Sequence, residues 1–218
     1  MRRLGHISGG YLLEKSCHDV HFMYSLMPSL PRQVMSFANK LTFTPQFVER
    51  LKQNKEHAVY LDHKAYANHP WNGASDLDLT HNDCIDHQVV IIQFHDGSIV
   101  SLNISVNAPI YTRSWTVRGV NGLCVCDLTT DLGQIWQVPS AVEEQVDLQS
   151  GEQNLTTYGT HFTLNMMKRV VNCLETSQLD EFPVKVDAVI NSTQLCFDIE
   201  QSRQQNKLVN CAPAFVLE

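Results

Sequence analysis

The chain has 218 residues and a formal net charge of −7, from 16 lysines and arginines against 23 aspartates and glutamates. This balance argues against binding to nucleic acid or to an acidic membrane, because both require a basic surface. No apolar run approaches the roughly 20 residues needed to span a bilayer, and the basic start leads into no apolar signal segment. Seven cysteines without the spacing of a disulfide scaffold favour a reducing compartment. We therefore predict a cytoplasmic protein whose partner is a small molecule or another protein.

The stretch from Gly9 to His21 carries more ionisable side chains than any other predicted helix. Gly9 and Gly10 open it, and neither proline nor glycine follows until after Met27, which predicts a helix over this range. At 3.6 residues per turn its apolar stripe contains Leu13, Cys17, Val20, Tyr24 and Met27, and the neighbouring face contains Glu14, His18, His21 and Ser25. A carboxylate and imidazoles on adjacent turns suit acid–base chemistry at neutral pH, although a surface helix with freely titrating histidines has the same spacing.

The next part of the chain predicts two strands separated by a helix and a loop. Residues 33–43 alternate as a strand, and Thr44 with Pro45 begins a short helix that ends near residue 56. Residues 58–81 are aromatic and polar, which predicts a loop where substrate contacts should lie. Residues 88–94 contain four consecutive branched apolar side chains and predict a strand buried on both faces.

Turn signals predict an antiparallel meander in the middle of the chain. Asp96-Gly97 leads into a strand at residues 100–106, and Asn121-Gly122 joins residues 111–119 to residues 123–128. The remaining segments are expected as follows: a strand at 134–138, a polar connection at 139–157, helices at 159–176 and 184–204, and an edge strand at 208–211. Without a repeat or a long linker, the pattern predicts a single α+β domain over residues 1–218. Its helices should pack on one face of an open, largely antiparallel sheet.

Motifs that bind cofactors or activate nucleophiles are missing from the sequence. It contains no glycine-rich dinucleotide fingerprint after a strand, no phosphate loop and no nucleophile elbow. Residues 81–87 include metal-ligand types, but their spacing matches no standard zinc site. A metal-dependent hydrolase that uses His18, His21 and residues 81–87 is nevertheless one alternative. Cys124 and Cys126 are interpreted as small buried side chains, and His161 near a helix start as a capping or solvated residue.

The opening stretch resembles the Gly-Gly-x-Leu-x-(Asp/Glu)-x-x-x-His motif of the glucose-fructose oxidoreductase/inositol dehydrogenase/MocA (Gfo/Idh/MocA) family of NAD(P)-dependent sugar and polyol dehydrogenases. Three further segments agree in order, at residues 86–97, 113–122 and 197–203. The resemblance covers almost the whole chain and implies the C-terminal α+β domain of such an enzyme. Members also have an N-terminal Rossmann domain, which binds the nicotinamide cofactor and supplies the lysine of a Glu-Lys-Pro motif.

The resemblance implies roles for individual residues. Glu14 falls on the acidic position and His18 on the catalytic histidine, so His18 would be the acid–base group and Glu14 its orienting partner. His21 falls where an aspartate is more usual, and it joins Tyr11 and His161 as predicted substrate-binding residues. Lys15 lies about 100° round the helix from Glu14, so it is not expected to replace the family's lysine.

The chain begins a few residues before the motif, so we expect the nucleotide-binding half to be absent. We then expect no cofactor bound by this chain alone, with NAD(P) implied only for a full-length homologue. The first hypothesis is the substrate-side half of an oxidoreductase, acting on a sugar-like substrate with a separate Rossmann domain as partner. The second is a non-catalytic dimerisation or carbohydrate-binding module. Under either hypothesis, an apolar sheet face predicts a homo-oligomer.

Overall fold

The structure is a computed structural model that describes residues 8–41, 44–46, 49, 53, 84–106, 112–127, 132–137, 142–147, 160–176 and 185–212. Its contacts divide the chain into two compact units. One contains Met1–Asn107 with Val184–Glu218, and the other contains Ala108–Pro183. Each unit has its own four-stranded sheet. The α+β class is confirmed, and a single domain over residues 1–218 stays a prediction.

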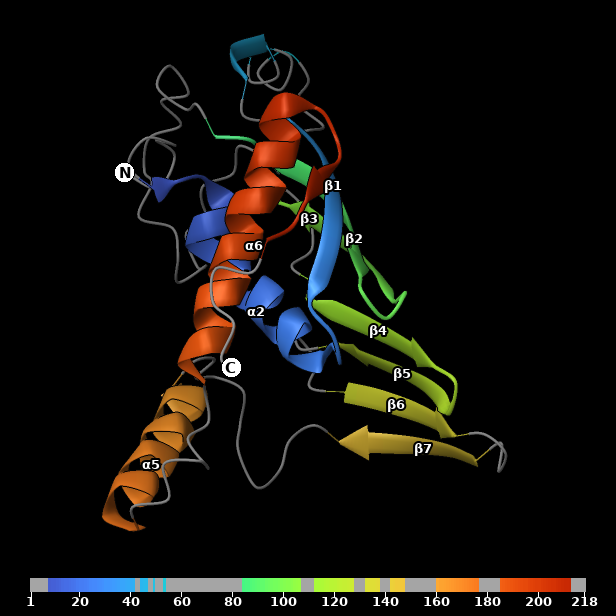
Figure 1. The fold of residues 1–218 in the computed structure, drawn as a ribbon, viewed down its shortest axis with the longest axis vertical. Helices are drawn as coiled ribbons and strands as arrows, with labels where there is room; N and C mark the ends of the chain where they lie inside the picture. Colours follow the sequence, from blue (N-terminus) through green and yellow to red (C-terminus); the bar gives the residue numbers. More distant parts are fainter. Residues whose placement is uncertain are drawn as a thin grey trace. The chain divides into compact units, whose positions relative to one another are not determined.

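The first unit is built on an antiparallel sheet with strand order β3-β2-β1-β8 (Figure 1). These strands are β1 (Pro31–Asn39), β2 (His87–Phe94), β3 (Ile99–Ser105) and β8 (Val209–Asn210). Gly97, with φ of +90°, turns the chain between β2 and β3, as the Asp96-Gly97 pair predicts. The predicted edge strand near the C-terminus is confirmed, because β8 pairs with β1 at the end of the described sheet.

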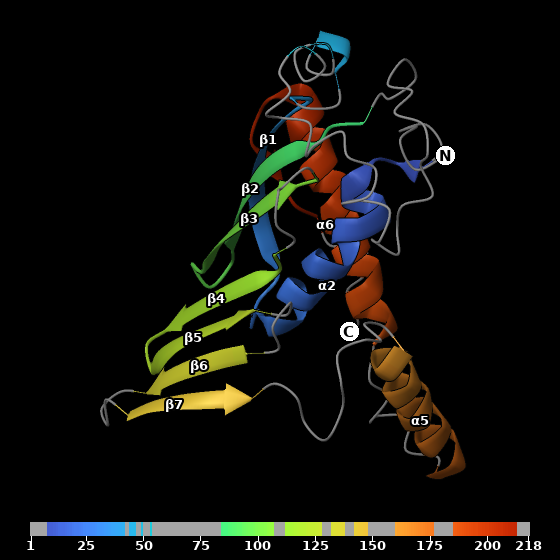
Figure 2. The ribbon, with the colours of Figure 1, turned by 180° about the vertical axis from the view of Figure 1, so that it is seen from behind.

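Helices cover one face of this sheet, which confirms the predicted arrangement. α6 (Val186–Gln205) packs on β1, and α2 (Cys17–Leu26) packs against α6. Figures 1 and 2 show both helices on the same side of the strands. The core between them contains Leu12, Val20, Met23, Val34, Val90, Ile92, Phe94, Leu195 and Ile199.

β2 is buried on one face only, so the expectation of a doubly buried strand is wrong. Its burial alternates: Val90 and Ile92 are fully buried under the helices, whereas Ile91 is 49% exposed. An unbroken apolar run does not distinguish a central strand of a covered sheet from a strand whose second face is open. The outer face of β2 therefore carries Val89 and Ile91, which are partly buried and exposed, respectively.

The second unit contains a meander of strand order β4-β5-β6-β7. Its elements are β4 (Ser114–Gly119), β5 (Gly122–Asp127), β6 (Leu132–Gln137), β7 (Val142–Asp147) and the helix α5 (Thr160–Thr176). Two expectations fail here. The middle of the chain is not one meander, because β2 pairs with β1 and β3 with β2 in the first sheet, and a strand occupies part of the predicted polar connection. The β4–β5 turn is Val120-Asn121, since Gly119 pairs with Gly122.

The predicted helix after Thr44 is described only in part. Positions 45, 46, 49 and 53 are helical, and the predicted loop at residues 58–81 lies outside the described residues. The helices expected at 159–176 and 184–204 are confirmed by α5 and α6. Among the described helices, none has the length and apolar character required to cross a bilayer.

Candidate active site

Gly9 and Gly10 precede the first helical segment and determine the backbone conformation at its start; we call them the glycine entry. Gly9 has φ of +72° and Gly10 has φ of +91°, in the left-handed region that other residues rarely adopt. A Cβ on Gly9 would lie 2.8 Å from Leu13 Cδ1, whereas a Cβ on Gly10 would meet nothing within 4 Å. The backbone at Gly10 is therefore open to whatever packs against this end of the segment.

The segment begins as a π-helix, Leu12–Ser16, before it becomes α2. A π turn holds more residues than an α turn and is frequent at functional sites. Its buried side is Leu12, Ser16 and Val20, which recur every four residues, and Met23 continues this side in α2. Of the stripe expected from the sequence, only Val20 is fully buried, because the wider turn changes which residues face the core.

Glu14 lies in the middle of the π-helix with its side chain 23% exposed. Its Oε1 is 3.7 Å from Lys15 Nζ, so the two side chains form an ion pair. They do so although consecutive residues of a helix point in different directions around its axis. Its backbone N–H donates to the Gly10 carbonyl at 3.1 Å. The backbone of Glu14 is thus held one turn from Gly10, and the ammonium group of Lys15 lies next to the Glu14 carboxylate.

His18 is exposed on α2, four residues after Glu14. Its imidazole has no hydrogen bond to another described residue, and because the residue is exposed, the ring is accessible to a ligand or to an opposing protein surface. Accessibility on an ordered helix is what an acid–base residue needs if the reacting molecule arrives from outside this unit.

His21 is oriented by the neighbouring helix. Its Nδ1 lies 2.9 Å from Ser192 Oγ, and Ser192 is almost fully buried on α6. One turn further along α2, the Tyr24 hydroxyl is hydrogen-bonded to Asn191, and burial raises the pKa of this phenol. The α2–α6 contact therefore holds His21 more firmly than His18.

The structure gathers four of the five predicted site residues into one helical segment. Tyr11 stands directly before the π-helix and is partly buried, with Glu14, His18 and His21 following. His161 belongs to α5 in the second unit, and its side chain is not among those described. All five assignments stay predictions.

Ser192 and Asn191 were not predicted as part of this region. Their signal in the sequence is a run of four polar residues, from Asn191 to Gln194, which follows Val189 and Ile190 inside a helix. Most buried polar side chains have a hydrogen-bond partner. A sequence does not show which partner the fold will bring, so this signal alone does not name His21.

The cysteines and the histidines do not form a metal site in the part of the chain that the structure describes. No group of three or more metal-ligating side chains lies together there. Burial raises the pKa of the Cys196 and Cys211 thiols to about 12, so both stay protonated and unreactive at neutral pH. The metal-dependent alternative gains no support from these residues.

Comparisons with solved structures give the same fold. Aldose-aldose oxidoreductase from Caulobacter crescentus, complexed with glycerol, is 12% identical with a TM-score of 0.63, and the match covers 96% of this chain and 50% of that one. Levoglucosan dehydrogenase in complex with NADH is 11% identical with a TM-score of 0.61, covering 91% and 49% of the two chains. UDP-N-acetylglucosamine 3-dehydrogenase from Acidithiobacillus ferrooxidans is 10% identical with a TM-score of 0.58, covering 89% and 47%. At such identities the likeness establishes the fold alone.

The chain spans about half the length of these oxidoreductases. Curated protein sequences give no match. A sequence profile for the C-terminal alpha/beta domain of an oxidoreductase family, Gfo/Idh/MocA, matches residues 2–210. The match includes the glycine entry, both sheets and α6, and so agrees with the resemblance found in the sequence. The chain belongs to the Gfo/Idh/MocA oxidoreductase family and corresponds to its C-terminal alpha/beta domain.

Proposed function

We propose that this chain is the substrate-side half of an NAD(P)-dependent sugar or polyol oxidoreductase and acts together with a nucleotide-binding half. The observation that carries the proposal is the family match over residues 2–210, which includes an exposed His18 beside Glu14 at an open glycine entry. The described residues offer no glycine-rich phosphate cradle after a strand. The nicotinamide would be held by the other half, and it would supply or accept the hydride.

Within this proposal, His18 exchanges the proton of the reacting hydroxyl. A neutral imidazole accepts that proton as the substrate is oxidised and returns it in the reverse direction. Glu14 lies four residues earlier on the same helical segment and would act as the orienting partner of His18. Tyr11 and His21 would contact the other hydroxyl groups of a sugar-like substrate, and His161 stays a predicted substrate-binding residue of the second unit.

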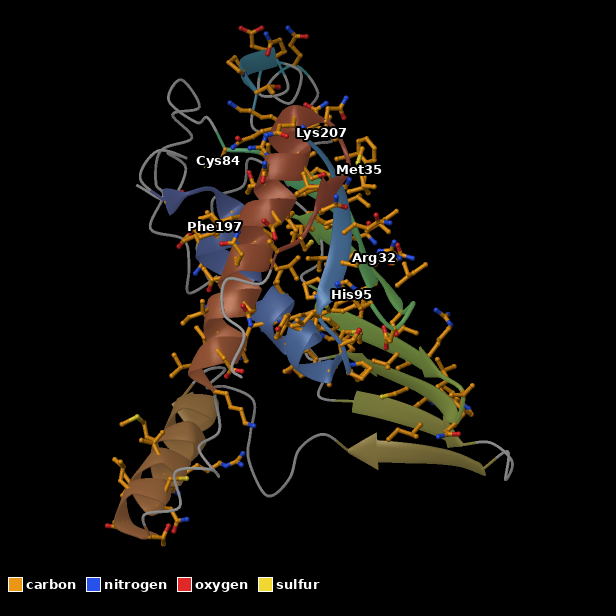
Figure 3. The ribbon with its side chains drawn as sticks, in the orientation of Figure 1. Arg32, Met35, Cys84, His95, Phe197 and Lys207 are labelled. Carbon is orange, nitrogen blue, oxygen red and sulfur yellow. The ribbon has the colours of Figure 1, made fainter. Side chains whose placement is uncertain are left out.

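A nucleotide-binding half needs a surface on this unit, and the helical side offers one. Several large apolar side chains on α2 and α6 are exposed: Phe22, Leu26, Val189, Ile190 and Phe197. Figure 3 shows Phe197 on the flank of α6. We propose that the partner half covers this side and brings the nicotinamide to His18.

The test is turnover by the purified chain alone and by the chain mixed with, or joined to, a nucleotide-binding half. NAD(P)H formation is followed at 340 nm over a panel of sugars and polyols, in both directions. We expect turnover only when both halves are present. Turnover by the chain alone would contradict the need for a second half. Binding of a sugar without turnover in either form would contradict the oxidoreductase and favour the carbohydrate-binding module.

The outer face of the first sheet supports self-association, which either function allows. Its in-register core is Met35 beside Ile91 and Phe37 beside Val89, with Phe37 54% and Ile91 49% exposed. The positions in register around this core carry no aspartate, glutamate, lysine or arginine: Gln33, Asn39, His87, Gln93, Ile99, Ser101, Asn103 and Ser105. A face without like charges can meet its own copy across a two-fold axis. We propose a second copy of this chain as its partner.

A further inference from the structure

The contact between His21 and Ser192 bears on which ring nitrogen of the neutral histidine carries the proton. Ser192 is 3% exposed, so its hydroxyl must find hydrogen-bond partners within the protein. One partner is His21 Nδ1, at 2.9 Å from Oγ. Either atom could be the donor if no other group were present.

A second partner of Ser192 favours one direction of this hydrogen bond. Ser192 Oγ donates to the carbonyl oxygen of Val189, 3.0 Å away and one turn earlier in α6. Serine in a helix commonly donates back to such a carbonyl. A hydroxyl has one proton and two lone pairs, so with its proton on Val189 the oxygen can only accept from His21. The proton of the neutral imidazole then lies on Nδ1.

We propose that Ser192 fixes neutral His21 in the Nδ1–H tautomer, which leaves Nε2 as a hydrogen-bond acceptor for a ligand hydroxyl. Neutral free histidine favours the opposite tautomer, whose Nε2 is a donor. No described residue is hydrogen-bonded to Nε2, and the ring is only partly buried, so this atom is available to a ligand. Ser192 is a positioning residue here, because it acts through His21.

The tautomer determines which ligand groups His21 can recognise. An acceptor nitrogen binds a hydroxyl proton and rejects a carbonyl or ether oxygen, which has no proton to offer. His18, three residues earlier, lacks such a partner among the described residues, so nothing there selects its tautomer. The identification of the ligand as a sugar or polyol rests on the proposed function, whereas the proposed tautomer rests on the contacts of Ser192 with Val189 and His21.

The test is long-range ¹H–¹⁵N NMR of the histidine rings in the full chain at about pH 8.5, well above the pKa of free imidazole. Without ligand, we expect a protonated Nδ1 and an unprotonated Nε2 for His21. Ser192→Ala removes the acceptor, and His21 should then move mainly to the Nε2–H form. An Nε2–H ring in the wild-type chain, or an unchanged pattern in Ser192→Ala, would overturn the inference.

Thr193→Ala is the matched control. Thr193 Oγ1 donates to the same Val189 carbonyl at 2.8 Å, but the side chain is exposed and makes no bond to His21. Its removal should leave the His21 tautomer unchanged, which separates a specific effect of Ser192 from a general loosening of α6. Addition of sorbitol should move the Nε2 resonance in the wild-type chain. An unmoved resonance would contradict the ligand role while the tautomer result stands, whatever the outcome of the turnover assay.

Discussion

The glycine entry shows how single residues define this helical segment. Both glycines have positive φ, and the carbonyl of Gly10 accepts the N–H of Glu14, so their conformation sets where the π-helix begins. Gly9 lies against Leu13, whereas Gly10 faces open space. The two positions therefore have the same backbone requirement but different surroundings.

Replacement of either glycine by alanine should destabilise the chain, and Gly9→Ala should do so more. Each alanine carries the strain of positive φ, about 1 kcal/mol, and Gly9→Ala adds an overlap with Leu13 that brings the loss to roughly 2 kcal/mol. Urea unfolding monitored by circular dichroism measures both. Equal losses would show that Leu13 moves aside freely.

The buried carboxyl group of Asp198 makes the stability of the folded chain depend on pH. Asp198 is buried on α6 with Gln194 Nε2 donating to its Oδ1 at 3.0 Å, and burial raises the pKa of its carboxyl above the 3.8 of an exposed aspartate. The folded chain therefore holds this proton at pH values where the unfolded chain has lost it. Its contribution to the free energy of unfolding falls as pH rises from about 3.8 through the folded pKa.

Asp198→Asn keeps an acceptor for Gln194 and removes the buried charge. We expect no change in stability at pH 3 and a gain at pH 7, measured by thermal unfolding across this range. A variant that is less stable at pH 7 would mean that the ionised carboxylate is stabilised by its surroundings after all.

At the scale of elements, a buried polar network ties α6 to the sheet where β8 ends. β8 pairs with β1 at Gln33 and Val34, so the N–H of Ser36, two residues on along the same edge of β1, has none of the described strands opposite it. Ser202 Oγ accepts that N–H at 3.0 Å and donates to the Lys207 carbonyl at 2.7 Å. Figure 3 shows Lys207 and Met35 at this end of α6 and β1.

The same network continues across the sheet. Gln88 Nε2 donates to Ser36 Oγ at 3.0 Å and to Glu200 Oε1 at 3.2 Å, and Glu200 is paired with Arg203. The donors and acceptors of β1, β2 and α6 are thus joined in one set of contacts. This fixes α6, and with it the Ser192 contact to His21, against the sheet.

Ser202→Ala should cost about 2 kcal/mol of folding free energy, because it leaves a buried N–H and a carbonyl without their partner. Ser101→Ala, an exposed serine on the outer face of β3, is the control and should change stability by less than about 0.5 kcal/mol. Chemical denaturation of both variants measures the difference. Equal effects would show that water replaces the hydroxyl of Ser202.

The sequence predicted most elements of this chain, because periodicity, glycine turns and proline boundaries are local signals. Its failures have physical causes. The π-helix changes which residues are buried around Ser16, and no composition signal marks such a turn. The pairing of β2 with β1 joins residues far apart in sequence, so alternation could not show which sheet the β2–β3 hairpin enters. Ser192 was missed because its partner lies on another helix.

At the scale of the molecule, the outer face of the first sheet defines the expected assembly. Ile91→Glu places a charge at its centre, opposite its own copy in a two-fold dimer, and should weaken association at least about 100-fold. Val120→Glu, a fully exposed position in the β4–β5 turn, is the control. Sedimentation velocity over a concentration series measures both. A wild-type chain that is monomeric at high micromolar concentration would contradict the proposed second copy.

The central claim is that His18 exchanges the proton of the reacting hydroxyl. Once a nucleotide-binding half gives turnover with this chain, kcat of His18→Ala should fall by about 100-fold or more, with nicotinamide binding unchanged. Ser25→Ala, an exposed residue on α2 that bonds only the Phe22 carbonyl within the described chain, is the matched control and should keep wild-type kcat. A His18→Ala complex that turns over at the wild-type rate would contradict the account.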